Sequence, residues 1–440
     1  MGGISIDSRD VSPGDLFVAL RAERDGHNFV AGAVARGAAG VLAERPVGAP
    51  AIVVEDTLRG LRRLGKAARE RASGARRGAV TGSVGKTSVT QAVRAGLERA
   101  GRAHASVKSF NNHIGVPLTL ARMPVDTERA IFEIGMNHAG EIAPLARLVQ
   151  PHAVAITTVE AVHVENFPDG EAGVANAKAE IFEGLERGGA AVLNGDNRWF
   201  DTLKAEARRH GARLRVFGAS KGADAELIRF TPAPGGASVE ARFDGKLIEF
   251  PIRQSAPHWG PMSLCALLTL QALDVDLETG VAALAEFEPL DGRGAERSVA
   301  WAGGRFLLID DSYNASPVST TAALRGLAGR IAAGRRIAVL TDMLELGPDA
   351  PRLHATLADA IIGGGIDLVF CAGPLMKSLW DALPAERRGA WTPGAAALEP
   401  ELTSAVRDGD VIMVKGSKAS NAHALSAALA ALAAAEGDKA

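Results

Sequence analysis

The fold is organised around the stretch Ala79-Val80-Thr81-Gly82-Ser83-Val84-Gly85-Lys86-Thr87-Ser88. This stretch predicts a short apolar strand, a glycine-rich turn and the start of a helix. In such a turn, backbone N–H groups and the positive end of the helix converge on one point and bind a polyphosphate. We expect Lys86 to reach the terminal phosphates and the Thr87 hydroxyl to bind magnesium. A plain glycine cap of a strand-to-helix turn is the alternative, and it leaves Lys86 and Thr87 unexplained. The predicted nucleotide-binding residues are Gly82, Ser83, Val84, Gly85, Lys86, Thr87 and Ser88.

Composition limits the class of protein. A chain of 440 residues is too long for one ordinary core and suggests roughly three domains. Its 49 basic and 51 acidic side chains give a net charge of -2, so no field of one sign attracts nucleic acid or an anionic membrane. The two cysteines lie far apart in apolar runs, which is typical of buried thiols in a reducing cytosol. No signal peptide or membrane span is evident, so we expect a cytoplasmic protein.

The order of apolar runs along the chain predicts an α/β fold with three domains. Residues 1–75 read as a small α/β domain, residues 76–290 as a doubly wound parallel sheet around the phosphate loop, and residues 291–440 as a second, Rossmann-like parallel α/β domain. Residues 223–252 within the central domain read as an antiparallel ribbon. Ligands of doubly wound sheets gather beyond the carboxyl ends of the strands, so the loops that follow the strands are the candidate sites.

Three polar residues follow strands of the central domain. Glu133 ends an apolar strand, where a buried carboxylate is costly unless a cation pairs with it, and magnesium held by Thr87 is a suitable partner. His163 follows the next strand, and Lys178 lies on a later helix. Taken singly, His163 could equally be an ordinary loop histidine and Lys178 a solvated helix lysine.

Two further strand ends carry charge in the C-terminal domain. Asp310 and Asp311 directly follow an apolar strand, where they are either ligand-binding residues or a helix N-cap with a solvated neighbour. Lys415 and Lys418 follow another strand and precede a helix, so they could face an anion at its N-terminus.

Taken together, these stretches resemble the Mur ligases of bacterial cell-wall synthesis, and the resemblance runs from about Ser5 to the C-terminus. The order and spacing of the motifs carry it, more than any one motif does. The motifs are Asp7-Ser-Arg9, Asp25-Gly-His27, Thr81 to Thr87, Asn111-Asn-His-Ile-Gly-Val-Pro117, Glu133-Ile-Gly-Met-Asn-His138, Gly140-Glu-Ile142, His163, Ala177-Lys-Ala-Glu-Ile181, Asp310 to Pro317, Met343 to Gly347 and Val414 to Lys418.

The resemblance implies an ATP- and Mg²⁺-dependent amide ligase that joins D-alanyl-D-alanine to a UDP-N-acetylmuramoyl tripeptide, and we expect the protein to be a monomer. The resemblance also implies that Lys86, Glu133, His163 and Lys178 are catalytic. Thr87 and Glu133 would hold one magnesium ion, and Glu133, His163 and Lys178, the last as a carbamate, would hold a second. The C-terminal ATP contacts would be Arg293, Asp310, Asp311 and Asn314. The substrate contacts would be Ser8, Arg9, Asp25, Gly26, His27, Asn112, Lys415 and Lys418.

Two other interpretations stay open at this point. One is a different ligase of the same architecture, either another Mur enzyme or a folylpolyglutamate synthase. The other is a nucleotide-binding protein that has lost ligase activity, which is favoured by Met262 standing where the family has an adenine-binding asparagine.

Overall fold

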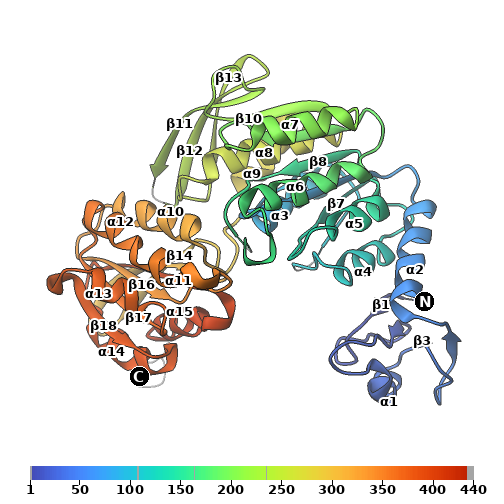
Figure 1. Cartoon of the computed structure of the whole chain (residues 1–440), viewed down its shortest axis with the longest axis horizontal. Helices are drawn as coiled ribbons and strands as arrows, with labels where there is room; N and C mark the ends of the chain where they lie inside the picture. The colour runs from blue at the N-terminus through green and yellow to red at the C-terminus, as the bar shows by residue number, and fades with distance from the viewer. Residues whose placement is uncertain (1, 107–108, 163, 234, 434–440) are drawn as a thin grey trace. The chain divides into compact units, whose positions relative to one another are not determined.

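The computed structural model describes residues 2–106, 109–162, 164–233 and 235–433. It is a mixed α/β protein whose three sheets are dominated by parallel strands, which confirms the predicted fold class (Figure 1). The chain divides into two compact units. The first consists of Met1–Val159, Ala175–Asp224 and Leu264–Ala283, and the second of Glu160–Val174, Ala225–Ser263 and Leu284–Ala440.

The N-terminal segment forms a four-stranded parallel sheet in the order β1-β2-β3-β4. Alternation along β2 separates two small cores: Phe17 packs with α1, whereas Leu16 and Val18 face α2 and α4. The elements are β1 (Ile4–Ser5), β2 (Leu16–Val18), a 3-10 helix (Gly26–Phe29), α1 (Val30–Ala35), β3 (Gly40–Ala43), β4 (Ala51–Val53) and α2 (Thr57–Arg71).

The central sheet surrounds the glycine-rich turn. Its parallel strands run in the order β10-β9-β8-β5-β7-β6, so the winding reverses on either side of β5 and creates the switch point at which such sheets bind ligands. The elements are β5 (Arg76–Thr81), α3 (Lys86–Ala100), β6 (Ala103–Ala105), α4 (Gly115–Ala121), β7 (Arg129–Glu133), α5 (Ile142–Val149), β8 (Ala153–Ile156), α6 (Glu171–Ala179), a 3-10 helix (Glu180–Gly184), β9 (Ala190–Asn194), α7 (Phe200–Arg209) and β10 (Arg213–Gly218).

The second unit contains the predicted antiparallel ribbon and the C-terminal sheet. The ribbon pairs β11 (Ala225–Ala233), β12 (Gly236–Phe243) and β13 (Lys246–Ile252). Helices α8 (Trp259–Ala272) and α9 (Leu277–Glu286) each contribute residues to both units. The C-terminal sheet has the order β14-β15-β19-β16-β17-β18. β14 pairs with β15 in antiparallel orientation, and the other neighbouring strands are parallel to one another.

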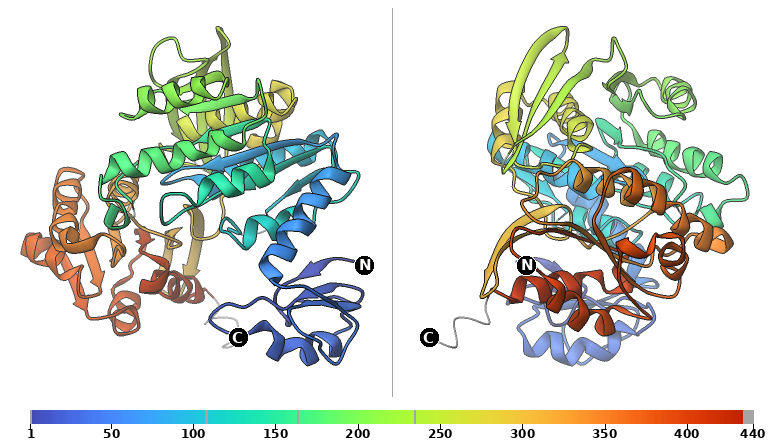
Figure 2. Two further views of the ribbon diagram at one scale, coloured as in Figure 1. Left: turned by 45° about the vertical axis from the view of Figure 1, so that its right-hand side comes forward. Right: turned by 90° about the vertical axis from the view of Figure 1, so that its left-hand side faces the viewer.

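Helices cover both faces of this C-terminal sheet (Figure 2). One apolar core packs α10 to α13 against the sheet, and another packs α14 and α15 against the opposite face. The elements are β14 (Ala295–Trp301), β15 (Gly304–Asp311), α10 (Pro317–Ala328), β16 (Arg336–Thr341), α11 (Ala350–Ala355), α12 (Leu357–Gly363), β17 (Leu368–Ala372), α13 (Lys377–Ala382), β18 (Arg388–Thr392), α14 (Ala395–Ala405), β19 (Val411–Lys415) and α15 (Ala422–Ala431), with short 3-10 helices at Val164–Asn166, Gly347–Asp349, Ala385–Arg387 and Lys418–Ser420.

The two helices that precede and follow β9 in the chain each have an irregular end. Helix α6 begins at Glu171 and is followed after Ala179 by a 3-10 helix. Helix α7 begins at Phe200, and before it the Asn197 side-chain amide donates to Thr158 Oγ1 and to the Val159 carbonyl, 2.9 Å away in each case. The boundaries predicted after residues 75 and 290 stay predictions.

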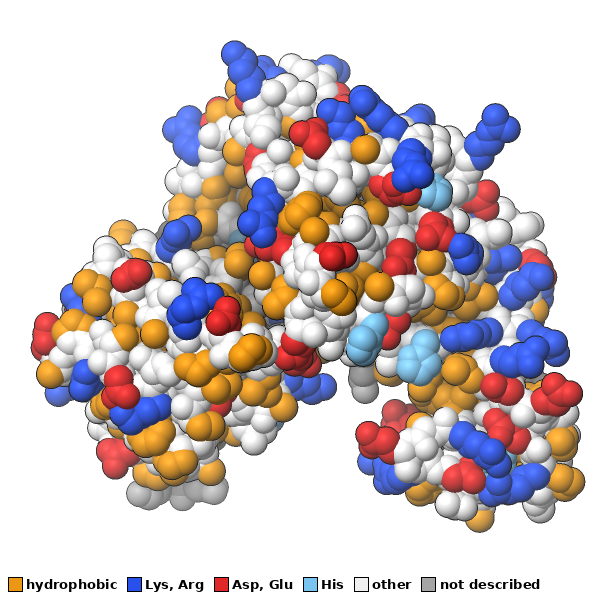
Figure 3. Space-filling model, in the orientation of Figure 1, with side chains coloured by type: hydrophobic (Ala, Val, Ile, Leu, Met, Phe, Trp, Pro, Cys, Tyr) orange, Lys and Arg blue, Asp and Glu red, His pale blue; other side chains and the backbone are white. Residues whose placement is uncertain are grey.

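The surface fits the balanced composition. Basic and acidic side chains are interspersed over the face that Figure 3 displays. Within the described ranges, no helix has the length and apolar character needed to cross a membrane.

Arg77 and His152 fix the end of the central sheet opposite the glycine-rich turn. The buried Arg77 guanidinium donates to the Val149 and Gln150 carbonyls at 3.0 and 3.1 Å and so caps the C-terminus of α5. The Arg77 backbone N–H donates to His152 Nδ1 at 3.1 Å, which requires an unprotonated nitrogen there. Desolvation, together with the charges of Arg77 and Arg76, lowers the pKa of His152 to about 4.

We predict that this histidine contributes to acid sensitivity. Its folded-state pKa of about 4 lies below the ordinary value of 6.5, so the unfolded chain takes up a proton first as the pH falls. The stabilising contribution is therefore complete above pH 6.5 and is lost as the pH falls toward 4. Urea midpoints measured from pH 7 to 4 should decline less steeply for His152→Gln than for the wild type. The exposed His138→Gln should follow the wild type, and identical slopes for all three proteins would refute the assignment.

Candidate functional site at the glycine-rich turn

The turn between β5 and α3 requires glycine at both of its glycine positions. A Cβ atom on Gly82 would lie 1.9 Å from Thr157 Oγ1, and Gly85 has a φ of +85° at the N-cap of α3. Thr157 Oγ1 donates to the Val84 carbonyl at 2.5 Å, and the Ser83 N–H donates to the Thr158 carbonyl at 2.8 Å. The end of β8 therefore fixes the turn in shape before any ligand binds.

Lys86 and Thr87 lie in the first turn of α3. Lys86 Nζ donates to the Gly82 carbonyl at 2.7 Å, so its positive charge lies over the turn. Ser88, the next residue, is buried. The predicted phosphate-loop residues thus form one contiguous element that joins a cationic side chain to a helix N-terminus, an arrangement that suits a polyphosphate.

Thr87, in the first turn of α3, is in direct contact with Glu133 at the end of β7. Thr87 Oγ1 donates to Glu133 Oε2 at 2.7 Å and lies 2.8 Å from Ser109 Oγ. Asn111 Nδ2 donates to Glu133 Oε1, also at 2.7 Å. The Glu133 side chain is only 1% exposed, so these hydrogen bonds compensate the burial of its carboxylate.

Lys178 is buried at the end of α6, which contradicts the solvated-lysine alternative. Desolvation, and then the positive charge of Lys86, lower the pKa of the Lys178 amine well below its ordinary value of 10.5. The structure thus brings Lys178 into the electrostatic environment of the glycine-rich turn. His163, the other predicted ligand, lies outside the described residues.

Glu180 connects the segment that carries Lys178 to helix α5. Its carboxylate accepts hydrogen bonds from the backbone N–H groups of Gly140, Ile142 and Ala143, at 2.6, 3.1 and 3.1 Å. These groups form the N-terminus of α5, where a carboxylate also interacts favourably with the helix dipole. This contact holds the chain after Lys178 against the loop that follows Glu133.

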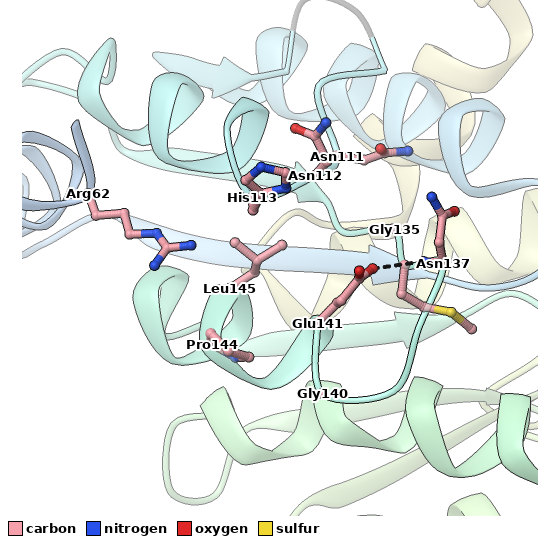
Figure 4. A pocket seen from close by; sticks show the side chains of 11 residues that line it. Arg62, Asn111, Asn112, His113, Gly135, Asn137, Gly140, Glu141, Pro144 and Leu145 are labelled. Carbon is pink, nitrogen blue, oxygen red and sulfur yellow. Dashed lines mark hydrogen bonds between the residues drawn. The ribbon is translucent and has the colours of Figure 1, made fainter. Parts of the chain in front are cut away.

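A cavity of about 380 Å³ lies beside these groups (Figure 4). The predicted substrate residue Asn112 lines it, and its Oδ1 accepts from the Ile114 and Gly115 N–H groups at 3.1 and 2.9 Å. The cavity is lined by Arg62, Asn111, Asn112, His113, Gly135, Met136, Asn137, Gly140, Glu141, Pro144 and Leu145.

The predicted substrate residues of the N-terminal segment are largely committed to internal contacts. Arg9 pairs with Asp7 at 2.6 Å and is exposed, while neighbouring Ser8 lies in the same turn. The buried His27 ring contacts Asp25 Oδ1 at 2.6 Å through Nδ1, and its Nε2 accepts from the Glu44 N–H at 2.9 Å. Gly26 has no room for a side chain, since a Cβ atom there would lie 2.6 Å from the Leu20 carbonyl oxygen.

In the second unit, the predicted C-terminal residues form a cluster around Tyr313. The Arg293 guanidinium stacks on the Tyr313 ring at 3.9 Å, and Lys418 Nζ lies 5.9 Å from the same ring centre. The buried Lys415 donates to Asp311 Oδ2 at 2.7 Å and to the Asn314 carbonyl at 3.0 Å.

Asp310 accepts from the Ser312 hydroxyl at 2.5 Å. The N-cap of α10 is Ser316, so the helix-cap alternative for the two aspartates is wrong.

The sequence did not predict a role in this site for Ser109, Asn111 or Glu180. Asn111 and Glu180 belong to motifs that the sequence had already marked, but nothing in their local pattern showed which carboxylate or helix they contact. No local sequence signal marks Ser109.

Family models match most of the chain. Family models described as the Mur ligase catalytic, middle and glutamate ligase domains match residues 1–69, 80–269 and 299–418. The chain is 31% identical to the UDP-N-acetylmuramoyl-tripeptide–D-alanyl-D-alanine ligase of Rickettsia prowazekii, over 94% of this chain and 92% of that protein. It is 35% identical to the Escherichia coli enzyme of the same name, over 85% and 81%.

The fold is also similar to that of a solved structure. A crystal structure of MurF from Acinetobacter baumannii, 28% identical, superposes with a TM-score of 0.86 over 97% of this chain and 93% of that chain. On the matched domains, the relatives and this shared fold, the chain belongs to the Mur ligase family.

Proposed function

We propose that the protein is the ATP-dependent ligase that joins D-alanyl-D-alanine to a UDP-N-acetylmuramoyl tripeptide in peptidoglycan precursor synthesis. One structural observation carries the proposal: the Thr87 hydroxyl of the phosphate loop and the buried Glu133 carboxylate meet at 2.7 Å, beside a cavity large enough for part of a peptide. The relatives named above, aligned over most of their length, carry this activity in their names. ATP and nucleotide-linked precursors are cytoplasmic, and we place the reaction there.

The charges of the reactants set the mechanism. The terminal carboxylate of the tripeptide attacks the γ-phosphorus of ATP, which produces an acyl phosphate and ADP. Both reactants are anions, so Lys86 and the backbone N–H groups of the turn offset their repulsion and hold them in line. The amine of D-alanyl-D-alanine then attacks the acyl carbon, inorganic phosphate leaves, and loss of a proton from nitrogen completes the amide.

The donor set around Glu133 fits magnesium. The Thr87 hydroxyl and the Glu133 carboxylate are oxygen ligands of the kind that magnesium prefers. We propose that Glu133, together with His163 and a carbamylated Lys178, would hold a second magnesium ion. Bound magnesium would neutralise phosphate charge as the transfer proceeds.

Carbamylation suits the surroundings of Lys178. The reaction with CO₂ needs a neutral amine, and burial beside Lys86 favours that form by lowering the pKa. The carbamate carries a negative charge, so it replaces repulsion from Lys86 by attraction and presents oxygen ligands to a cation.

The remaining predicted contacts belong to the same proposal. Asp310 or Asp311 would bind the ribose of ATP, with Arg293 and Asn314 as further ATP contacts. Ser8, Arg9, the Asp25–His27 segment, Asn112, Lys415 and Lys418 would contact substrate. The monomeric state stays a prediction.

Phosphate release measured with each substrate omitted in turn tests this function. Release that requires both the muramoyl tripeptide and D-alanyl-D-alanine supports it. Release that depends on glutamate instead indicates a folylpolyglutamate-type ligase, and absent or substrate-independent release indicates a protein without ligase activity.

We predict that Lys86→Ala lowers kcat by about 100-fold or more, because a preorganised positive charge at the transferring phosphate is lost. Phosphate release at saturating ATP measures this. The matched control is Lys221→Ala, which removes an exposed lysine of the same unit. Wild-type turnover in Lys86→Ala would remove the loop from the proposed mechanism.

We predict that Lys178→Ala loses most activity and that added short-chain carboxylates, such as acetate or propionate, restore part of it. The carboxylate would occupy the space of the carbamate and supply its oxygen ligands. The same salts should not restore Lys86→Ala, because that substitution removes a positive ammonium group, which a carboxylate cannot replace. Full activity of Lys178→Ala without any additive would rule out the carbamate.

A further inference from the structure

Arg62 is a cation in the cavity that the proposed mechanism does not use. It lies on α2, is partly buried, and its side chain extends toward Leu145 and His113 (Figure 4). No described residue forms a hydrogen bond or an ion pair with its guanidinium. Arg69, two turns later on the same helix, instead donates to the Leu148 carbonyl at 2.5 Å. A partly buried guanidinium with such a surplus of donors is suited to an anion.

Packing between helices holds Arg62 at this position. Leu61, the preceding residue, packs in one apolar cluster with Leu118 and Ala121 of α4. Gly65 allows α2 to approach α4 closely, since a Cβ atom on it would lie 3.0 Å from the Pro117 carbonyl oxygen. Arg62 therefore faces the Asn111–His113 loop, which precedes α4, as a consequence of the fold.

The polarity of the other lining residues is compatible with an anion bound to Arg62 in the cavity. Asn111, Asn112, His113 and Asn137 are polar, whereas Glu141 is the one carboxylate that lines it. Glu141 is already engaged, because it accepts from the Asn137 N–H at 2.8 Å and contacts His138 at 3.3 Å.

The cavity also adjoins the predicted reaction centre. Asn111 lines it and at the same time donates to Glu133, the carboxylate in contact with the phosphate-loop hydroxyl. The part of the substrate that reaches this centre is the reacting end of the peptide, since the uridine diphosphate lies at the opposite end of the molecule. The cavity thus suits the peptide stem.

We propose that Arg62 binds a non-reacting carboxylate of the peptide stem, and so sets the affinity for the tripeptide-bearing nucleotide. This inference rests on the proposed function and adds a specificity-determining residue to it. The same guanidinium could bind a diphosphate, because both groups are oxyanions that accept two parallel N–H donors.

Calorimetric titration without ATP tests the proposal on the full chain. The variants are Arg62→Ala and Arg62→Lys, and the control is Arg63→Ala, which removes the exposed neighbour on the same helix. The ligands are UDP-N-acetylmuramoyl tripeptide, the same molecule with its non-reacting carboxylates amidated, and UDP-N-acetylmuramic acid without peptide.

Arg62→Ala should bind the tripeptide nucleotide about 30-fold more weakly, the size expected for one charge-assisted pair. Arg62→Lys should lose less affinity, and Arg63→Ala none. Wild type should bind the amidated tripeptide nucleotide about as weakly as Arg62→Ala binds the unmodified one. Arg62→Ala should bind the amidated and the unmodified nucleotides with the same affinity. UDP-N-acetylmuramic acid should bind equally to wild type and variants. In turnover, KM for the tripeptide nucleotide should rise while kcat stays within about two-fold.

Equal losses for the tripeptide nucleotide and for UDP-N-acetylmuramic acid would assign Arg62 to the diphosphate and overturn the proposal. Unchanged affinity in both Arg62 variants would also overturn it. If Arg62→Ala fails to fold, the amidated ligand and Arg62→Lys decide the question. Failure of the wild-type protein to bind the tripeptide nucleotide would instead refute the proposed function.

Discussion

The hydrogen bond from Thr87 to Glu133 is the contact on which the rest of the site depends. It joins the first turn of α3 to the end of β7, so a phosphate-binding helix and a carboxylate-bearing strand are held at one point. Asn111 completes the arrangement by occupying the second Glu133 oxygen. Burial of a carboxylate is costly unless hydrogen-bond donors surround it, and Thr87 and Asn111 supply such donors here.

Two lysines lie close to the same glycine-rich turn. Lys86 lies over the turn, and Lys178 is buried where that charge is felt. Two cations in one poorly solvated region are unfavourable unless an anion joins them or one amine is neutral. In the proposed function, the triphosphate is the anion beside Lys86. The neutral amine of Lys178 reacts with CO₂ to form a negatively charged carbamate.

Backbone contacts from distant segments keep these side chains in place. Thr157, at the end of β8, holds the turn through the Val84 carbonyl, and Glu180 holds the N-terminus of α5. In the second unit, Lys415 at the end of β19 is likewise bound to Asp311 at the end of β15. In each unit, charged groups gather where parallel strands end, because the carboxyl ends of such strands meet at one edge of the sheet.

Periodicity, glycine spacing and charged residues after apolar runs are local signals, and they predict the α/β class, the glycine-rich turn and the strand ends that carry Glu133 and Asp310. Only the tertiary structure decided that Lys178 is buried, that His27 and Lys415 are held by internal partners, and that Asn111 and Glu180 support the site. It also showed that Arg62 enters the cavity, whereas its neighbour Arg63 is exposed. Burial, pairing and the side of a helix that meets a cavity depend on segments far apart in the chain, and a local pattern contains no information about them.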